Sequence, residues 1–122
     1  MVGNDKNNLQ ATLNKISTKP NVHLKLLSIF LTQFETDVVE LEKSVTDKDH
    51  NNVFQTAHKL KSALKIFDHE MYDQVSRLEK YGSDKVDFEK ISSEYSSFST
   101  KVRVKIPILQ EAKASLESQL NS

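Results

Sequence analysis

Apolar residues recur at spacings of three and four along most of this 122-residue chain, which is the period of an amphipathic α-helix. One such repeat predicts a helix from near Asn21 to about Val45. Ile29, Phe30 and Val39 widen its apolar stripe. A wide stripe indicates that this helix contacts two neighbours.

The N-terminal segment predicts a short helix followed by a break. Residues 1–6 are expected to form a flexible N-terminus, because few of them could be buried in a core. Three apolar residues at spacings of four and three then mark a helix over residues 7–17. Pro20 separates this helix from the long one, because proline disfavours the helical conformation in the residue before it.

Two helices of intermediate length follow the long one. The first is expected from about His50 to Phe67 and the second from about His69 to Tyr81. An aspartate side chain can accept a hydrogen bond from the first turn of a helix. Asp47 or Asp49 is therefore the candidate N-cap of the first of these helices, and Asp68 that of the second.

The end of the chain predicts a long helix that starts after Gly82. This glycine is placed to end the preceding helix in the left-handed conformation. The last apolar repeat runs from Val86 to about Leu120, which is about 50 Å of helix at about 1.5 Å per residue. Pro107 lies inside it and cannot donate a backbone hydrogen bond. We expect either one bent helix that overhangs the bundle or two helices broken near Ser99 to Ile106.

Four substantial helices joined by short polar turns predict an all-α fold, an antiparallel four-helix bundle with a short extra N-terminal helix. Two glycines and two prolines are too few for the many turns of a β-sandwich or barrel. Residues 7–122 are therefore interpreted as one domain, and this length suffices for a single hydrophobic core.

Composition and charge remove several classes of function. Seventeen basic residues balance seventeen acidic ones, whereas a nucleic-acid-binding protein usually has a clear excess of Lys and Arg. The absence of cysteine removes disulfides, thiolate metal sites and thiol catalysis. No apolar run approaches the ~20 residues that cross a bilayer. We expect a soluble, cytoplasmic protein without membrane insertion and without a nucleic-acid partner.

The helix predicted over residues 50–67 has two faces of different character. Its apolar stripe consists of Val53, Ala57, Leu60, Leu64 and Phe67. His58 lies about 140° from the centre of this stripe at about 100° per residue, so its imidazole is expected to face solvent. Phe54, Lys61, Ser62 and Lys65 project within about 60° of it, and no acidic residue occurs between Phe54 and Phe67.

The other three histidines lie at or near predicted helix starts. For His23, His50 and His69 we expect ordinary solvated side chains. His58 differs from them because it has basic and small neighbours on its own face of a helix.

The face around His58 suits a phosphoryl group better than a metal ion or a catalytic triad. No second metal ligand lies three or four residues from His58, and no acid on that face could orient its ring beside Ser62. A neutral imidazole nitrogen is a good nucleophile near neutral pH. Lys61 and Lys65 would offset the charge of a phosphoryl group. On spacing alone, a solvated face rich in lysine explains the pattern equally well.

The residues around His58 resemble a known family. Ala57-His58-Lys59-Leu60-Lys61-Ser62-Ala63 is similar to the core motif of histidine-containing phosphotransfer (HPt) domains, a-H-x-L-K-G-[SA]. Leu27-Ser28-Ile29-Phe30-Leu31 resembles the second-helix signature of that family, and Arg77-Leu78-Glu79 resembles the end of its following helix. The resemblance covers roughly Val22 to Tyr81, about half of the chain.

The resemblance implies a phosphorelay intermediate. HPt domains accept a phosphoryl group on the histidine from the phospho-aspartate of a receiver domain and pass it to the aspartate of another receiver. They are carriers without autonomous kinase activity, and the receiver supplies Mg²⁺ and the acidic residues, so the domain itself needs no metal and no cofactor. The implied partners are response-regulator receiver domains and a hybrid sensor histidine kinase. We expect the protein itself to be a monomer.

By resemblance His58 is the phosphoacceptor and Lys61 is the lysine of the family motif. We expect Lys65 and Ser62 to support the phosphoryl group as well, and Phe54 and Lys59 to contact a docked receiver. The chain departs from the family where Ser62 and Asp68 replace glycines. Serine is still small, and aspartate tolerates turns and caps helices.

Two other hypotheses stay open at this point. The protein could be a helical adaptor that dimerises through its long last helix, or a regulator that binds receivers without exchanging phosphate. An exposed His58 ring beside Lys61 or Lys65 would favour phosphotransfer, whereas a buried ring would be an ordinary core histidine.

Overall fold

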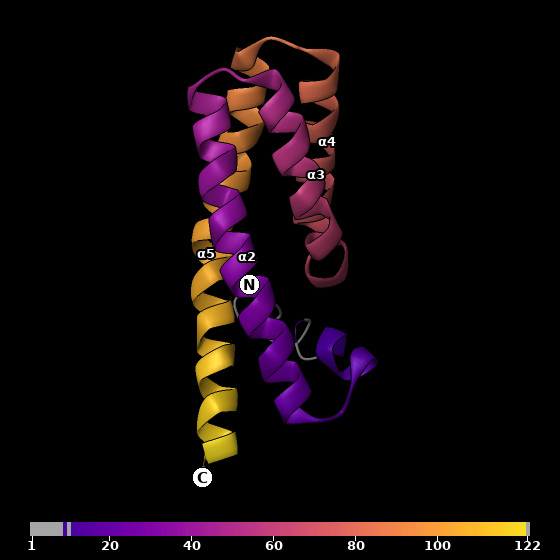
Figure 1. The fold of residues 1–122 in the computed structure, drawn as a ribbon, viewed down its shortest axis with the longest axis vertical. Coiled ribbons are helices and arrows are strands. Elements are labelled where there is room, and N and C mark those ends of the chain that lie inside the picture. The colour runs from indigo at the N-terminus through magenta and orange to yellow at the C-terminus, as the bar shows by residue number, and fades with distance from the viewer. Residues whose placement is uncertain (1–8, 10, 122) are drawn as a thin grey trace. The chain divides into compact units, whose positions relative to one another are not determined.

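The computed structural model describes residue 9 and residues 11–121, and this part of the chain contains helices and no strand. Leu9 and residues 11–16 are helical. Four longer helices follow, namely α2 (Pro20–Thr46), α3 (His50–Phe67), α4 (His69–Asp84) and α5 (Phe88–Asn121) (Figure 1). The all-α fold class is confirmed. The expected flexible segment 1–6 lies outside the described residues, as do parts of the predicted first helix.

The chain divides into two compact units. One consists of Met1–Gln33 with Arg103–Ser122, and the other of Phe34–Val102. Helices α2 and α5 each contribute to both units, whereas α3 and α4 belong wholly to the second. All of the candidate site residues lie in this second unit.

The unit Phe34–Val102 is a four-helix bundle with a continuous apolar core. Each of its four helical segments contributes side chains that are at most 2% exposed: Phe34, Leu41, Val53, Ala57, Leu60, Leu64, Met71, Val75, Leu78, Ile91 and Phe98. Burying one of these side chains larger than alanine contributes about 1.5–3 kcal/mol. The four predicted inner residues of α3 from Val53 to Leu64 are all buried, so the core fixes which face of α3 meets solvent.

Polar contacts join neighbouring helices around this core. Nδ2 of Asn52 on α3 donates to Oγ of Ser44 on α2, and Nε2 of Gln74 on α4 donates to Oγ of Ser97 on α5. His50 was expected to be solvated, but its Nε2 lies 2.7 Å from the carbonyl of Val86 and its ring packs on Phe88. It therefore ties the start of α3 to the connection before α5.

The other unit buries Leu9, Leu13 and a histidine. Leu9 and Leu13 are buried and line a cavity of about 210 Å³ together with Leu116 of α5. His23 is 2% exposed, and its Nε2 lies 2.5 Å from the carbonyl of Ser17. The expectation of a solvated His23 is therefore wrong. The hydrogen bond to Ser17 explains how a polar ring is accommodated inside this unit.

Aspartates start α3 and α4 as the sequence predicted. Oδ1 of Asp49 accepts from the backbone N–H of Asn52 at 3.1 Å, so Asp49 rather than Asp47 is the cap of α3. Oδ1 of Asp68 accepts from the N–H of Met71 at 3.0 Å, and the N–H of Asp68 donates to the carbonyl of Leu64. One residue thus closes α3 and opens α4, and the turn keeps its function without glycine.

The predicted role of Gly82 is wrong. Gly82 is buried inside α4, which continues to Asp84, and the residue in the left-handed conformation is Lys85 (φ 54°, ψ 45°). A Cβ on Gly82 would lie 2.7 Å from the backbone nitrogen of Phe54. Glycine is needed here for the close approach of two helices and not for a turn.

One alternative and one further expectation fail in the long helices. Helix α5 continues through Pro107 as a single helix, so of the two alternatives the break between Ser99 and Ile106 does not occur. In α2, Phe30 is buried, but Ile29 and Val39 are 60% and 67% exposed. The buried apolar stripe of α2 is therefore narrower than expected, because only Phe30 of these three residues belongs to it.

Candidate functional site

His58 lies on the solvent face of α3. Its side chain is 65% exposed, whereas Ala57 beside it and Leu60 two positions later are buried in the core. Phe54, one turn earlier, is half-buried, and its ring centroid lies 6.2 Å from that of His58. The packing of α3 thus presents the imidazole outward next to an aromatic ring.

A carboxylate from α4 contacts this imidazole. Oε2 of Glu79 lies 2.5 Å from Nδ1 of His58, and Oε1 of the same group accepts from Nζ of Lys61 at 2.9 Å. The Glu79 side chain is only 18% exposed. The expectation that no acid could orient the ring is wrong. The sequence of α3 contains no such acid, but Glu79 of the neighbouring helix reaches the ring.

The charges of this cluster stabilise one another. Partial burial raises the pKa of Glu79, but the hydrogen bonds from Lys61 and His58 together outweigh it and hold this pKa below its usual value. The hydrogen bond to Glu79 is the main cause that raises the pKa of Lys61. Near neutral pH the cluster therefore contains a carboxylate and an ammonium group.

The ionised Glu79 decides which nitrogen of His58 carries the proton. A carboxylate can only accept hydrogen bonds, so Nδ1 must be the donor at 2.5 Å. In the neutral ring, Nε2 then holds the lone pair. The cluster thus leaves Nε2 as the nucleophilic nitrogen of an exposed imidazole.

The other predicted site residues take different positions. Lys59 points to α2, where its Nζ lies 3.6 Å from Oε2 of Glu40. Ser62 and Lys65 are exposed, and within the described part of the chain neither side chain forms a hydrogen bond or ion pair. The structure therefore brings together His58, Lys61 and Phe54, and it leaves Lys65 as the lysine of this face without an acidic partner.

Residues 25–95 match the protein family described as Hpt domain. This match spans all of α3 and α4, and with them His58, Lys61 and Glu79. The chain belongs to the Hpt domain family. No curated protein and no solved structure matches it. Members of this family take part in phosphotransfer in two-component phosphorelays, as carriers of the phosphoryl group and not as catalysts.

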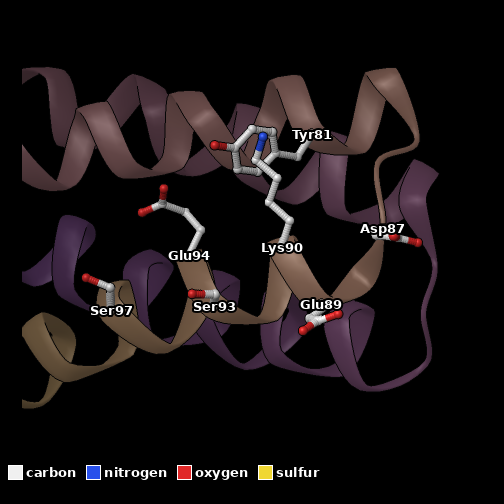
Figure 2. Close-up of a pocket in the computed structure, with 7 residues that line it drawn as sticks. All are labelled: Tyr81, Asp87, Glu89, Lys90, Ser93, Glu94 and Ser97. Carbon is white, nitrogen blue, oxygen red and sulfur yellow. The ribbon is translucent and has the colours of Figure 1, made fainter.

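The Hpt domain also has a groove that none of the predicted site residues lines. It has a volume of about 590 Å³ and lies along α4, α5 and the connection between them, from Tyr81 to Ser97 (Figure 2). Two of its charged groups, Lys90 and Glu94, already have partners. Nζ of Lys90 lies 4.7 Å from the centroid of the Tyr81 ring, and Glu94 accepts from Nε of Arg77 at 2.6 Å. Asp87 and Glu89 also line the groove. Its acidic residues therefore outnumber its one lysine, which does not suit an anionic phosphoryl group.

The described part of the Hpt domain shows neither a metal cluster nor a membrane span. No three His, Asp or Glu side chains gather there as metal ligands, and none of its helices is both long and apolar enough to cross a bilayer. The site around His58 is an open surface rather than an enclosed pocket, in contrast to the concave sites that bind small molecules.

Proposed function

We propose that this Hpt domain accepts a phosphoryl group on Nε2 of His58 from the phospho-aspartate of a receiver domain and passes it to the aspartate of a second receiver. The observation that carries this proposal is the contact of 2.5 Å between Nδ1 of His58 and Glu79 on an exposed imidazole. It supplies a nucleophilic nitrogen on a surface that another protein can reach.

The transfer step uses the groups of this cluster. The lone pair on Nε2 attacks phosphorus, the new N–P bond forms, and the P–O bond to the aspartyl carboxyl group breaks, which returns a carboxylate to the receiver. Nδ1 keeps its proton, so the ring becomes positively charged. Glu79 lies 2.5 Å from that N–H and would stabilise this charge. The second transfer reverses these steps, with the receivers supplying Mg²⁺ and acidic residues.

The two lysines take different roles in this proposal. Lys61 is bound to Glu79, so it orients the carboxylate and compensates its charge. Lys65 lies two helical turns beyond His58, and helical side chains lean toward the N-terminus of their helix. We assign to Lys65 the contact with the phosphoryl group or with an acidic group of the docked receiver. Ser62, one turn from His58, is small enough to let the receiver approach.

The adaptor hypothesis gains no support from the exposed residues of α5. Val104 and Leu120 are its exposed large hydrophobic residues. They are separated by sixteen positions, which places them about 160° apart around the helix axis. They do not form one stripe that a second copy could cover. The monomeric state and the cytoplasmic location stay predictions.

Transfer of label from a phosphorylated receiver tests the proposal. The wild-type protein should gain acid-labile, alkali-stable label when it is incubated with phosphorylated receivers of its own cell. His58→Gln should gain none. His69→Gln is the matched control, because His69 is an exposed histidine at the start of the next helix, and this variant should be labelled as the wild type is. A protein that none of these receivers labels would refute the proposal.

A further inference from the structure

Gly82 is the point at which α4 comes closest to the backbone of α3. A Cβ on this residue would lie 2.7 Å from the backbone nitrogen of Phe54, 2.8 Å from the carbonyl oxygen of His50 and 3.1 Å from the Cα of Phe54. All three atoms belong to the main chain of a helix and cannot rotate away as the end of a side chain could. Any larger residue at position 82 must therefore move one helix relative to the other.

Glycine at this position has no other evident cause. The left-handed residue after α4 is Lys85, and Gly82 itself has no positive φ. Glycine in a helix interior is less favourable than alanine, so helix propensity alone would favour a side chain here. The close approach to α3 is the property that only glycine permits.

The close approach is adjacent to the histidine site. Helices α3 and α4 follow each other through the single residue Asp68 and run antiparallel (Figure 1). Glu79 precedes Gly82 by one turn of α4, and His58 follows Phe54 by one turn of α3. The contact of Gly82 with Phe54 and the contact of Glu79 with His58 are therefore neighbouring contacts along the same pair of helices.

We propose that Gly82 is a positioning residue for His58. It sets the separation of α3 and α4 at which the Glu79 carboxylate reaches Nδ1 at 2.5 Å. A methyl group at position 82 would push the helices apart by about half an ångström or more, and a hydrogen bond weakens steeply as it lengthens and bends. The effect on the imidazole follows from this geometry, and only its consequence for phosphotransfer rests on the proposed function.

The tautomer of His58, read from the ¹⁵N resonances of its ring, tests this proposal without any phosphorylation. In the wild type, Nδ1 should have the shift of a protonated nitrogen and Nε2 that of an unprotonated one. Glu79→Ala removes the hydrogen bond completely and should move the two shifts toward each other. The size of this change is the reference for full loss. Gly82→Ala should produce at least half of that change.

Val75→Ala is the matched control. Val75 is fully buried in α4, one turn before Glu79, so its truncation loosens the packing of α4 without adding bulk against α3. This variant should keep the wild-type ring shifts. If Gly82→Ala folds and keeps the wild-type shifts, or if Val75→Ala changes them as much, the proposal is wrong.

A Gly82→Ala protein that does not fold in buffer is measured again with trimethylamine N-oxide, which favours the compact state. If it stays unfolded there, Gly82 serves the whole fold and the positioning role is refuted. Failure of the wild-type protein to take label from a receiver would refute the proposed function instead, and it would leave the result on the tautomer unchanged.

Discussion

Nδ1 of His58 lies 2.5 Å from Oε2 of Glu79, a residue that follows 21 positions later in the chain and belongs to the next helix. The other carboxylate oxygen holds the ammonium group of Lys61. The site is therefore formed by two helices. Its positive charge is partly neutralised, in contrast to the uniformly basic face that α3 shows when considered alone.

Glu79→Gln should reverse the tautomer of His58. The Lys61 ammonium group can only donate, so it would take the amide oxygen and turn the amide NH₂ toward Nδ1. Nδ1 would then hold the lone pair and Nε2 the proton. Loss of a hydrogen bond to a charged group costs about 1.5–3 kcal/mol, so initial transfer rates from a phosphorylated receiver should fall about 10- to 100-fold.

Glu70→Gln is the control for this variant. Glu70 is also a carboxylate of α4, but it pairs with Lys101 of α5. Transfer should continue at the wild-type rate in this protein. Equal rates for Glu79→Gln and the wild type would show that Glu79 does not act on the imidazole.

Lys65→Met should weaken the binding of a phosphorylated receiver and reduce the dependence of binding on salt. An exposed ion pair contributes about 0.2–1 kcal/mol, so the Kd should rise up to about fivefold. Titration of the receiver at low and high ionic strength measures both effects. Lys25→Met, which removes an exposed lysine from the other compact unit, should change neither, and a similar change in both variants would contradict the role given to Lys65.

Acid should remove the stabilisation that Glu79 contributes. Its pKa in the folded protein lies below the ordinary value of 4.5. The contribution is therefore complete above this ordinary value and is lost as the pH falls through the lower pKa of the folded state. The difference in free energy of unfolding between the wild type and Glu79→Gln, measured with urea, should shrink across this range. A difference that grows toward acid pH would contradict the assigned direction.

The two aspartate caps should stabilise their helices separately. Asp49→Ala and Asp68→Ala each remove a side-chain acceptor from a backbone N–H, and each should lower the free energy of unfolding by about 1 kcal/mol. Asp47→Ala removes an aspartate from the same turn as Asp49 without removing the cap. Urea denaturation should show almost no change for it, and an equal loss in Asp47→Ala would mean that the cap is assigned to the wrong residue.

The periodicity of apolar residues predicted the helices well because burial follows that period. The boundaries of α3 and the burial of Val53, Ala57, Leu60 and Leu64 agree with the pattern. The exposure of His58 follows from the same pattern, because a residue opposite a buried stripe meets solvent. The family resemblance likewise rested on residues within α3 and its neighbours, and the family match confirms it.

The expectations about Glu79 and Gly82 fail because they depend on contacts between two helices. The spacing of apolar residues within one helix does not predict such contacts. In the sequence, Glu79 belongs only to the motif Arg77-Leu78-Glu79, and nothing within α4 shows that its carboxylate reaches α3. Local turn preferences suggest that Gly82 ends α4. Glycine is needed there instead because a Cβ would lie 2.7 Å from the backbone of α3. Both contacts could have been located from the antiparallel pairing of α3 and α4. Residues at similar distances from Asp68 along the two helices lie opposite each other.

The position of the phosphoryl group on the ring decides whether Nε2 of His58 is the acceptor. The ¹⁵N-labelled protein is phosphorylated by its receiver, and the ring nitrogen that couples to ³¹P is identified by NMR. We expect phosphorus on Nε2 of His58 and a retained proton on Nδ1. Phosphorus on Nδ1, or on any residue other than His58, would contradict it.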